Sequence, residues 1–321
     1  MQLQILPYKK NNKDKIILNE ILQLYNFTSD KIKNIFLCGA KIDQGKTLRD
    51  FISKRFKEKY AKYNIVFPEY LFDSLIKRGE INILNLENQL ASDADIIIMP
   101  LEKEAYGTFT ELGAFTTLGI CTSNNLLIKK IIIISNIDYK DDSSFINLGP
   151  IKLISKENEK HVIYFKIDYG DFPNKEELTK LFEELIMTIR YLNIKSRKKE
   201  LNNIFGLSIF LLIMISIYKK ITKNEIFDML DDYFGSKLQF ELVEPSLGNL
   251  SSNELIFLNK TENPPCYSLT DVGENYIFEE LFENLDSRKR ISKIKALLIN
   301  SNYRKLKKFD LEEERKWFLE L

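Results

Sequence analysis

The sequence predicts an α/β protein with a doubly wound, mostly parallel sheet, followed by a smaller, mainly helical domain. Up to about residue 190, short apolar runs alternate with helix-length amphipathic segments, as expected of parallel strands joined by crossover helices. After the charged segment 193–200, NIKSRKKE, most segments are helical. We therefore expect two domains, 1–190 and 200–321, consistent with a chain of 321 residues.

Each expected element of the first domain follows from its local pattern. The β-rich runs predict strands at 34–40, 64–69, 95–100 and 129–136. The amphipathic segments predict helices at 47–60, 70–76, 82–94 and 111–123. The carboxyl ends of parallel strands share one edge of the sheet, and ligands bind there where the strand order reverses. We therefore look for a site in the loops that follow the strands.

Composition narrows the classes of function. With 47 basic and 46 acidic residues, the chain has no overall charge to attract nucleic acid or a membrane. Its cysteines, Cys38, Cys121 and Cys266, are odd in number and widely separated, which indicates neither a disulfide framework nor a zinc site. His161 is the one histidine, so histidine-based metal sites and Ser-His-Asp catalysis are close to excluded.

The sequence predicts a cytoplasmic protein that does not associate with membranes. The first 15 residues, MQLQILPYKKNNKDK, lack an apolar run followed by a cleavage site of small residues, so they do not form a secretory signal. Residues 201–218 carry no charge, but they include Asn, Ser and Gly and are shorter than the roughly 20 apolar residues that a membrane helix needs. We expect a buried helix there.

The segment GTFTELGAF, residues 107–115, allows two interpretations. In the first, Thr108 caps a helix and Glu111 reaches back to the cap as part of a capping box. In the second, Glu111 faces the crevice from the first helical turn, where the helix dipole stabilises its negative charge. Such a carboxylate can attack or stabilise a sugar carbon with oxocarbenium character. The motif alone fits both interpretations equally.

Read in order, FLCGA, FPEYLFDSLI, LENQLASDADIIIMP and GTFTELGAF resemble the nucleoside 2-deoxyribosyltransferase-like family. The resemblance covers roughly residues 33–150 and implies a Rossmann-like fold with Glu111 as nucleophile. Glu69 is then the best second carboxylate, with a solvated residue after Pro68 as the less favoured alternative. The resemblance also implies substrate contacts at Cys38, Gly39, Ala40, Arg49, Pro100, Glu102, Gly107, Thr108 and Asn147.

Two of these assignments have a structural alternative. Arg49, which could bind a phosphate, could also be a surface charge on an amphipathic helix. Asn147, which could bind the sugar hydroxyls, could be a turn residue before Gly149.

One position departs from the family pattern. Many transferases of this family have Asp six residues before the nucleophile, where this chain has Ala105, with Glu102 and Glu104 as possible substitutes. A purine leaves well only when an acid protonates it, whereas nicotinamide departs neutral from a cationic ring. We therefore expect hydrolysis of NAD, as substrate, with no metal or other cofactor.

A narrower resemblance adds SFINLGP, residues 144–150, and a winged helix that follows. Together these motifs are similar to the toxic effectors of type II retrons. That resemblance implies an anti-phage role, with the reverse transcriptase and its RNA–DNA product as partners that hold the enzyme in check. A homo-oligomer or higher assembly is compatible with it.

The second domain is expected to be a helix-turn-helix with a wing. Helices are predicted at 204–220, 222–234 and 251–259, followed by a short strand at 266–270. Thr270 is expected to cap the next helix and Gly273 to allow close packing. Nine cations follow in residues 286–308: Arg288, Lys289, Arg290, Lys293, Lys295, Arg304, Lys305, Lys307 and Lys308. They predict either contacts to nucleic-acid phosphates or a solvated helix face.

Two other functions remain open from the sequence. One is a nucleoside or nucleotide 2-deoxyribosyltransferase or hydrolase, which acts on deoxynucleosides rather than NAD. The other is a transcriptional regulator that senses a nucleotide with its first domain and binds duplex DNA with its winged helix.

Overall fold

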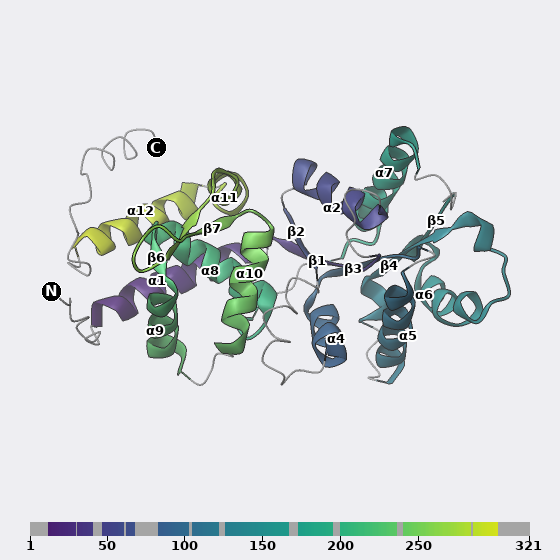
Figure 1. Cartoon of the computed structure of the whole chain (residues 1–321), viewed down its shortest axis with the longest axis horizontal. Coiled ribbons are helices and arrows are strands. Elements are labelled where there is room, and N and C mark those ends of the chain that lie inside the picture. Colours follow the sequence, from purple (N-terminus) through teal and green to yellow (C-terminus); the bar gives the residue numbers. More distant parts are fainter. Residues whose placement is uncertain are drawn as a thin grey trace.

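The computed structural model shows two lobes, an α/β lobe and a mainly helical lobe, side by side along the long axis (Figure 1). It describes residues 12–29, 31–40, 47–60, 62–67, 83–102, 105–121, 126–166, 173–194, 200–235, 240–283 and 285–300.

The α/β lobe is built on a five-stranded sheet with the strand order β2-β1-β3-β4-β5. Its strands are β1 Lys33–Leu37, β2 Tyr63–Val66, β3 Ile96–Pro100, β4 Ile131–Asn136 and β5 Val162–Phe165. All four pairings are parallel, and the order reverses between β1 and β3. The predicted doubly wound sheet is therefore confirmed, with one strand, β5, that the sequence analysis did not expect.

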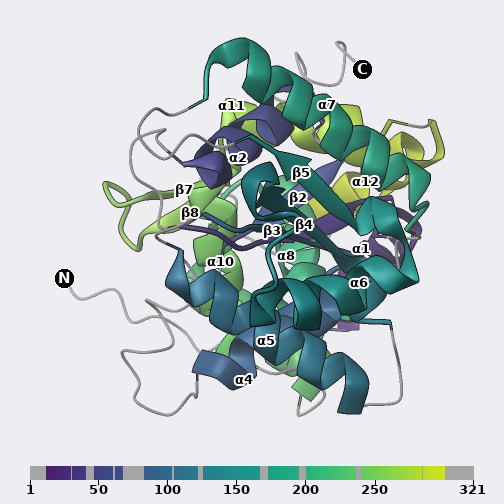
Figure 2. The same cartoon turned by 90° about the vertical axis from the view of Figure 1, so that its right-hand side faces the viewer.

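Helices cover both faces of this sheet (Figure 2). On one face lie α2 Leu48–Lys59 and α7 Lys175–Tyr191; on the other lie α4 Ile83–Asp93, α5 Tyr106–Cys121 and α6 Lys152–Glu157. Alternate strand residues face each layer: Ile96 and Ile98 pack with α2 and α7, whereas Ile97 and Met99 pack with α4 and α5. Because both faces are covered, the strands are almost continuously apolar.

The expected helices of this lobe are confirmed at 47–60 and 82–94, and the one expected at 111–123 begins five residues earlier, at Tyr106. The helix expected at 70–76 lies outside the described residues.

The second lobe combines helices with a three-stranded antiparallel sheet of order β6-β8-β7. Its elements are α8 Ile204–Tyr218, β6 Ile221–Thr222, α9 Lys223–Phe234, α10 Val243–Ser252, β7 Ile256–Asn259, β8 Cys266–Leu269, α11 Asp271–Tyr276 and α12 Leu285–Asn300. The predictions for 204–220, 222–234 and 266–270 are confirmed. The helix predicted at 251–259 is wrong, because α10 ends at Ser252 and the following apolar residues pair with β8 as strand β7.

Thr270 and Gly273 behave as expected. The Thr270 hydroxyl accepts a hydrogen bond from the Gly273 N–H at 3.0 Å and caps α11. A Cβ atom at Gly273 would lie 1.9 Å from the Leu255 carbonyl oxygen, so only glycine fits.

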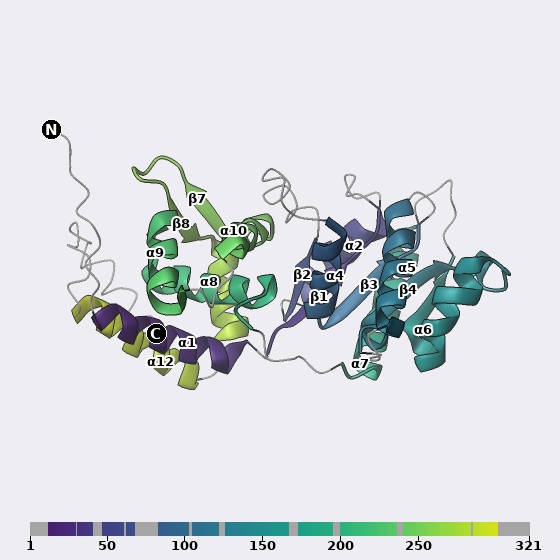
Figure 3. The ribbon, with the colours of Figure 1, turned by 90° about the horizontal axis from the view of Figure 1, so that it is seen from below.

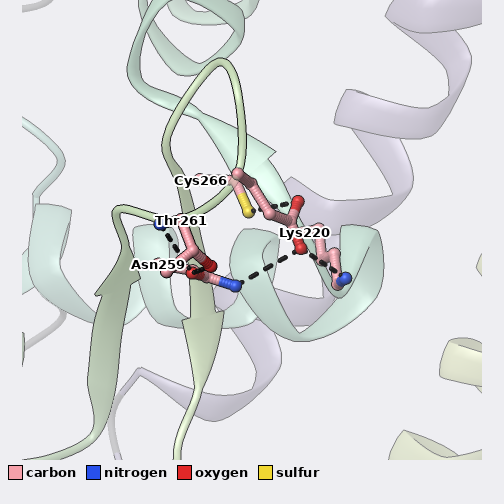
Figure 4. A network of polar contacts seen from close by, with 5 residues as sticks. Lys220, Asn259, Thr261 and Cys266 are labelled. Carbon is pink, nitrogen blue, oxygen red and sulfur yellow. Dashed lines mark hydrogen bonds and ion pairs between the residues drawn. The ribbon is translucent and has the colours of Figure 1, made fainter.

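A polar network ties the β7–β8 connection to the end of α8 (Figure 4). Lys220 Nζ lies 2.6 Å from Glu262 Oε1, and Asn259 Nδ2 donates to the same oxygen at 3.3 Å. Cys266 Sγ donates to Glu262 Oε2 at 3.2 Å. The network fixes this hairpin against the helical core of the lobe.

Helix α8 is apolar on all sides and is covered by its neighbours. It has 15 residues, of which Ser216 alone is not buried. The expectation of a buried helix is confirmed. In the part of the chain that the structure describes, no helix combines the length and apolar character needed to cross a membrane.

Helix α1, Asn12–Thr28, belongs spatially to the second lobe although it precedes the first in the chain. It lies alongside α12 (Figure 3). Tyr25 packs edge-on against Phe210 of α8, with ring centroids 5.8 Å apart, and Tyr233 of α9 donates to Asn19 at 3.0 Å. The described part of the predicted domain 1–190 thus contributes one helix to the second lobe.

The lobes also meet at the edge strand β2. Asn253, which follows α10, donates from Nδ2 to the Ile65 carbonyl at 3.2 Å. This contact joins the helical lobe to a strand whose carboxyl end borders the site described next.

Candidate active site

The carboxyl edge of the sheet at the β1–β3 reversal gathers most of the residues that the sequence singled out. Cys38, Gly39 and Ala40 follow β1, and the Cys38 N–H donates to the Ile98 carbonyl of β3 at 3.0 Å. Pro100 is the last residue of β3 and pairs with Ile134. Glu102 follows β3, and α5 begins four residues later.

Glu111 is not part of a capping box. Because α5 begins at Tyr106, Thr108 is its third residue and Glu111 its sixth, more than one turn from the start. Thr108 is 2% exposed, and its N–H donates to the Ala105 carbonyl at 2.9 Å. The capping interpretation is therefore wrong.

The Glu111 side chain instead meets Cys38 at the end of β1. Burial raises the pKa of the Cys38 thiol, and the negative charge and hydrogen bond of Glu111 raise it further. The charge of Glu87 on α4 acts in the same direction, and that of Arg49 opposes it. Two carboxylates, from α4 and α5, thus lie close to the end of β1.

Arg49 is a buried residue rather than a surface charge. Its side chain is 1% exposed, its guanidinium carbon lies 4.9 Å from the centre of the Phe67 ring, and Nη1 donates to the Gly39 carbonyl at 3.4 Å. The interpretation as a solvated charge is wrong, because Phe67 and the β1 turn cover the side chain.

The turn after β1 depends on glycine. Gly39 has φ +131°, and a Cβ atom there would lie 3.2 Å from Arg49 Cβ. Few other residues adopt this backbone conformation. The close approach of Arg49 and Gly39 therefore defines the shape of the first turn.

Glu102 binds the first turn of α2. Its Oε1 accepts the Leu48 N–H at 3.1 Å. Burial raises the pKa of Glu102, while hydrogen bonds from the backbone N–H groups of Leu48 and Ala40 oppose that rise. Thr47 caps the same helix by accepting the Asp50 N–H at 3.1 Å. The described contacts of Glu102 are thus with α2 and the β1 turn.

Of the remaining predicted residues, Gly107 and Asn147 are described by the structure. Gly107 is exposed in the first turn of α5, with no atom within 4 Å of an added Cβ. Asn147 is the first residue of a π-helix, Asn147–Ile151, so the interpretation as a turn residue is wrong. Its Nδ2 donates to the backbone carbonyls of Tyr139 and Asp142. Its contact with a sugar remains a prediction. Glu69 and Glu104 lie outside the described residues.

Two neighbours of the site were missed by the sequence analysis. Glu87 lies on an amphipathic helix, where a carboxylate is ordinarily solvated, and Phe67 follows an edge strand. Both lie within the segments FPEYLFDSLI and LENQLASDADIIIMP that carry the family resemblance, which was the signal that could have found them. Their place at the site depends on the packing of α4 and α2 against the sheet.

The predicted nucleic-acid residues of α12 divide into two groups. Arg290 donates to Gln23 of α1 at 3.3 Å, and Lys293 pairs with Glu20 of α1 at 2.7 Å. Arg288 and Lys289 are exposed, and Lys295 is half-buried. The cations from Arg304 to Lys308 lie outside the described residues.

These observations define the class: a two-lobed protein with a Rossmann-like α/β lobe, which carries an acidic site at its strand-order reversal, and a mainly helical lobe. The family follows from comparison with known proteins. The chain matches the model of the STM3845 retron effector protein over residues 45–258 and belongs to this family of retron effectors. The resemblance to retron effectors is thereby confirmed.

Two Escherichia coli relatives are similar over much of their length. The protein of retron Ec86, provisionally named a ribosyltransferase/DNA-binding protein, is 27% identical over 292 residues, which cover 87% of this chain and 88% of the relative. The protein of retron Ec73, which carries the same provisional name, is 29% identical over 226 residues, covering 65% of this chain and 69% of the relative.

Proposed function

We propose that this retron effector is an N-glycosidase that hydrolyses NAD and releases nicotinamide. We further propose that the reverse transcriptase and its RNA–DNA product hold it in check until phage infection. The relatives' names, which include ribosyltransferase, support a glycosyl-transfer reaction. The observation that carries the proposal is the position of Glu111: it lies inside α5 with no capping role and contacts Cys38 at the strand-order reversal.

In the proposed reaction, the Glu111 carboxylate attacks or stabilises the C1′ carbon of the nicotinamide ribose as the bond to the ring nitrogen breaks. The bonding electrons pass to the ring, so nicotinamide leaves neutral. Water then adds at C1′ and gives ADP-ribose and a proton. No acid is needed at the leaving group, and no metal or other cofactor enters the scheme.

The neighbours of Glu111 favour a leaving group that needs no proton. Ala105, at the position where the resembling family often has Asp, is 5% exposed and apolar. Glu102 accepts the Leu48 N–H at 3.1 Å and is directed to α2. Among the described residues, Glu87 and Glu111 both place negative charge at the end of β1, which suits a cationic nicotinamide ring.

The arrangement of α8, α9 and α10 before the β7–β8 hairpin supports the winged-helix interpretation of the second lobe (Figure 1). Its α10, the second helix of the helix-turn-helix, has no basic residue and buries six of its ten residues. Its unburied residues, Glu244, Gly248, Ser251 and Ser252, offer no positive charge to the DNA phosphates. This disfavours the alternative of a transcriptional regulator.

Chromatography of products tests the proposal. The purified chain, free of its partners, is incubated with NAD, NADP, deoxyadenosine and deoxycytidine monophosphate in EDTA. We expect nicotinamide and ADP-ribose from NAD. Release of free base from the deoxynucleosides with NAD intact would instead support the 2-deoxyribosyltransferase or hydrolase alternative. Sequence-specific duplex binding without any turnover would support the regulator.

A further inference from the structure

Two backbone donors that flank the first strand–helix connection of the α/β lobe are occupied by a protein carboxylate, while residues 41–46, which lie between them in the chain, are outside the described residues. In Rossmann-like sheets the helix N-terminus at this turn ordinarily receives a phosphate of the ligand. Here the Leu48 N–H, at the start of α2, donates to Glu102 Oε1 at 3.1 Å. Ala40, which follows Gly39 after β1, also donates its N–H to Glu102.

Two further groups at the start of α2, among the residues that the structure describes, are also engaged. The Asp50 N–H donates to Thr47 Oγ1 at 3.1 Å, and the Asp50 carboxylate adds a second negative charge beside Glu102. The Arg49 side chain is 1% exposed, stacks on Phe67 and donates to the Gly39 carbonyl at 3.4 Å. Its described contacts are therefore with the Phe67 ring and the Gly39 carbonyl.

We propose that Glu102 is a specificity-determining residue: its carboxylate takes the place of a ligand phosphate at the α2 N-terminus and keeps anionic groups from the Leu48 and Ala40 N–H groups. The effector then accepts N-glycosides whose phosphates bind elsewhere and whose portion beside Glu102 is neutral or cationic. This deepens the proposed function, on which its statement about substrates rests. It also replaces the expectation that Arg49 binds phosphate.

The inference is tested by phosphate binding, which requires no turnover. Orthophosphate is titrated by calorimetry into the full-length protein and into Glu102→Gln and Glu102→Ala. The Gln variant keeps an oxygen for the Leu48 N–H but removes the charge; the Ala variant frees both N–H groups. Since a helix N-terminus attracts an anion, we expect phosphate affinity to rise roughly tenfold in Glu102→Ala and less in Glu102→Gln.

Glu58→Ala is the matched control, because Glu58 is a carboxylate on the same helix, in its last turn, paired with Arg55 at 3.8 Å. It should bind phosphate as the unmodified protein does. Circular dichroism and thermal unfolding establish that each variant is folded. Equal phosphate affinity in the unmodified protein and a folded Glu102 variant overturns the inference. Phosphate binding by the unmodified protein as tight as that expected of Glu102→Ala also overturns it, whether or not the variants fold.

A kinetic measurement separates this inference from the proposed function. If NAD is cleaved, orthophosphate should inhibit Glu102→Ala at roughly tenfold lower concentration than it inhibits the unmodified enzyme. If NAD stays intact while the Glu102 variants gain phosphate binding, the proposed function fails and the role of Glu102 at the turn stands. If NAD is cleaved and phosphate binding does not change, the proposed function stands and the role of Glu102 fails.

Discussion

Replacing Glu111 with Gln is the sharpest perturbation of the proposed reaction. The amide has almost the shape of the carboxylate, so the Cys38 thiol can still donate a hydrogen bond to its oxygen. Helix α5 begins at Tyr106 and does not use Glu111 as a cap, so the helix start is unaffected. Exchanging one partly buried hydrogen bond alters the free energy of unfolding by about 1 kcal/mol or less.

The catalytic loss should be far larger. Removing a charge that stabilises a developing oxocarbenium ion costs about 10²–10³-fold in kcat, or roughly 2.7–4 kcal/mol, and more when the same group is the nucleophile. Nicotinamide release is measured by chromatography, alongside thermal unfolding of each protein. Glu58→Gln, on α2, serves as a control that should retain activity. A folded Glu111→Gln protein with near-normal turnover would refute the assignment of Glu111.

Three further predictions concern binding and stability. Lys289→Glu should weaken binding of the RNA–DNA product and flatten the salt dependence of that binding without altering stability. Lys293→Glu should also lower the melting temperature, because Lys293 pairs with Glu20 at 2.7 Å. Salt titrations of binding and thermal unfolding of both variants check this. Gly273→Ala should destabilise the protein by roughly 1–3 kcal/mol, since the added Cβ would lie 1.9 Å from the Leu255 oxygen. Gly107→Ala, with no atom within 4 Å of its added Cβ, should leave the stability unchanged. Denaturant titrations of both variants measure the difference. Burial lowers the pKa of His161 below 6.5, so the unfolded chain binds the proton more tightly than the folded protein does. The free energy of unfolding should therefore fall as pH drops below about 6.5. His161→Gln should reduce the dependence of this free energy on pH, and an unchanged dependence would contradict the reasoning.

The sequence predicted those parts of the fold whose local pattern agrees with their packing. The isoleucine runs of β3 and β4 are buried on both faces, as an apolar run between turns implies. Strand β5, with the sequence VIYF, was missed; like the equally short β2, which was predicted, it has four residues, and its pairing with β4 defines it as a strand. The segment after Ser252 was predicted as helix because its apolar residues fit a helix as well as a strand, and pairing with β8 decided the outcome.

The site shows the same division between local pattern and packing. The motif containing Glu111 was found from sequence, but the Thr108–Glu111 spacing suggested a cap, because helix starts are set by residues before the motif as well as within it. Arg49 looked like a surface charge on an amphipathic helix. Its burial depends on Gly39 and Phe67, which lie 10 residues before it and 18 residues after it in the sequence. Contacts of this kind have no local sequence pattern.

The placement of α1 predicts how the protein can be divided. Ile17, Leu18, Ile21 and Leu24 of α1 are each at most 1% exposed, and Tyr25 of the same helix packs on Phe210 of α8. A chain that ends at residue 194 would keep α1 but lose α8 and α12. It would expose this apolar stripe, and exposed patches of that kind promote aggregation. Residues 31–194, which also lack α1, should remain monomeric and keep the five-stranded sheet. Size-exclusion chromatography and circular dichroism of the two fragments decide the matter: if residues 1–194 are as well folded and dispersed as residues 31–194, the assignment of α1 to the helical lobe is wrong.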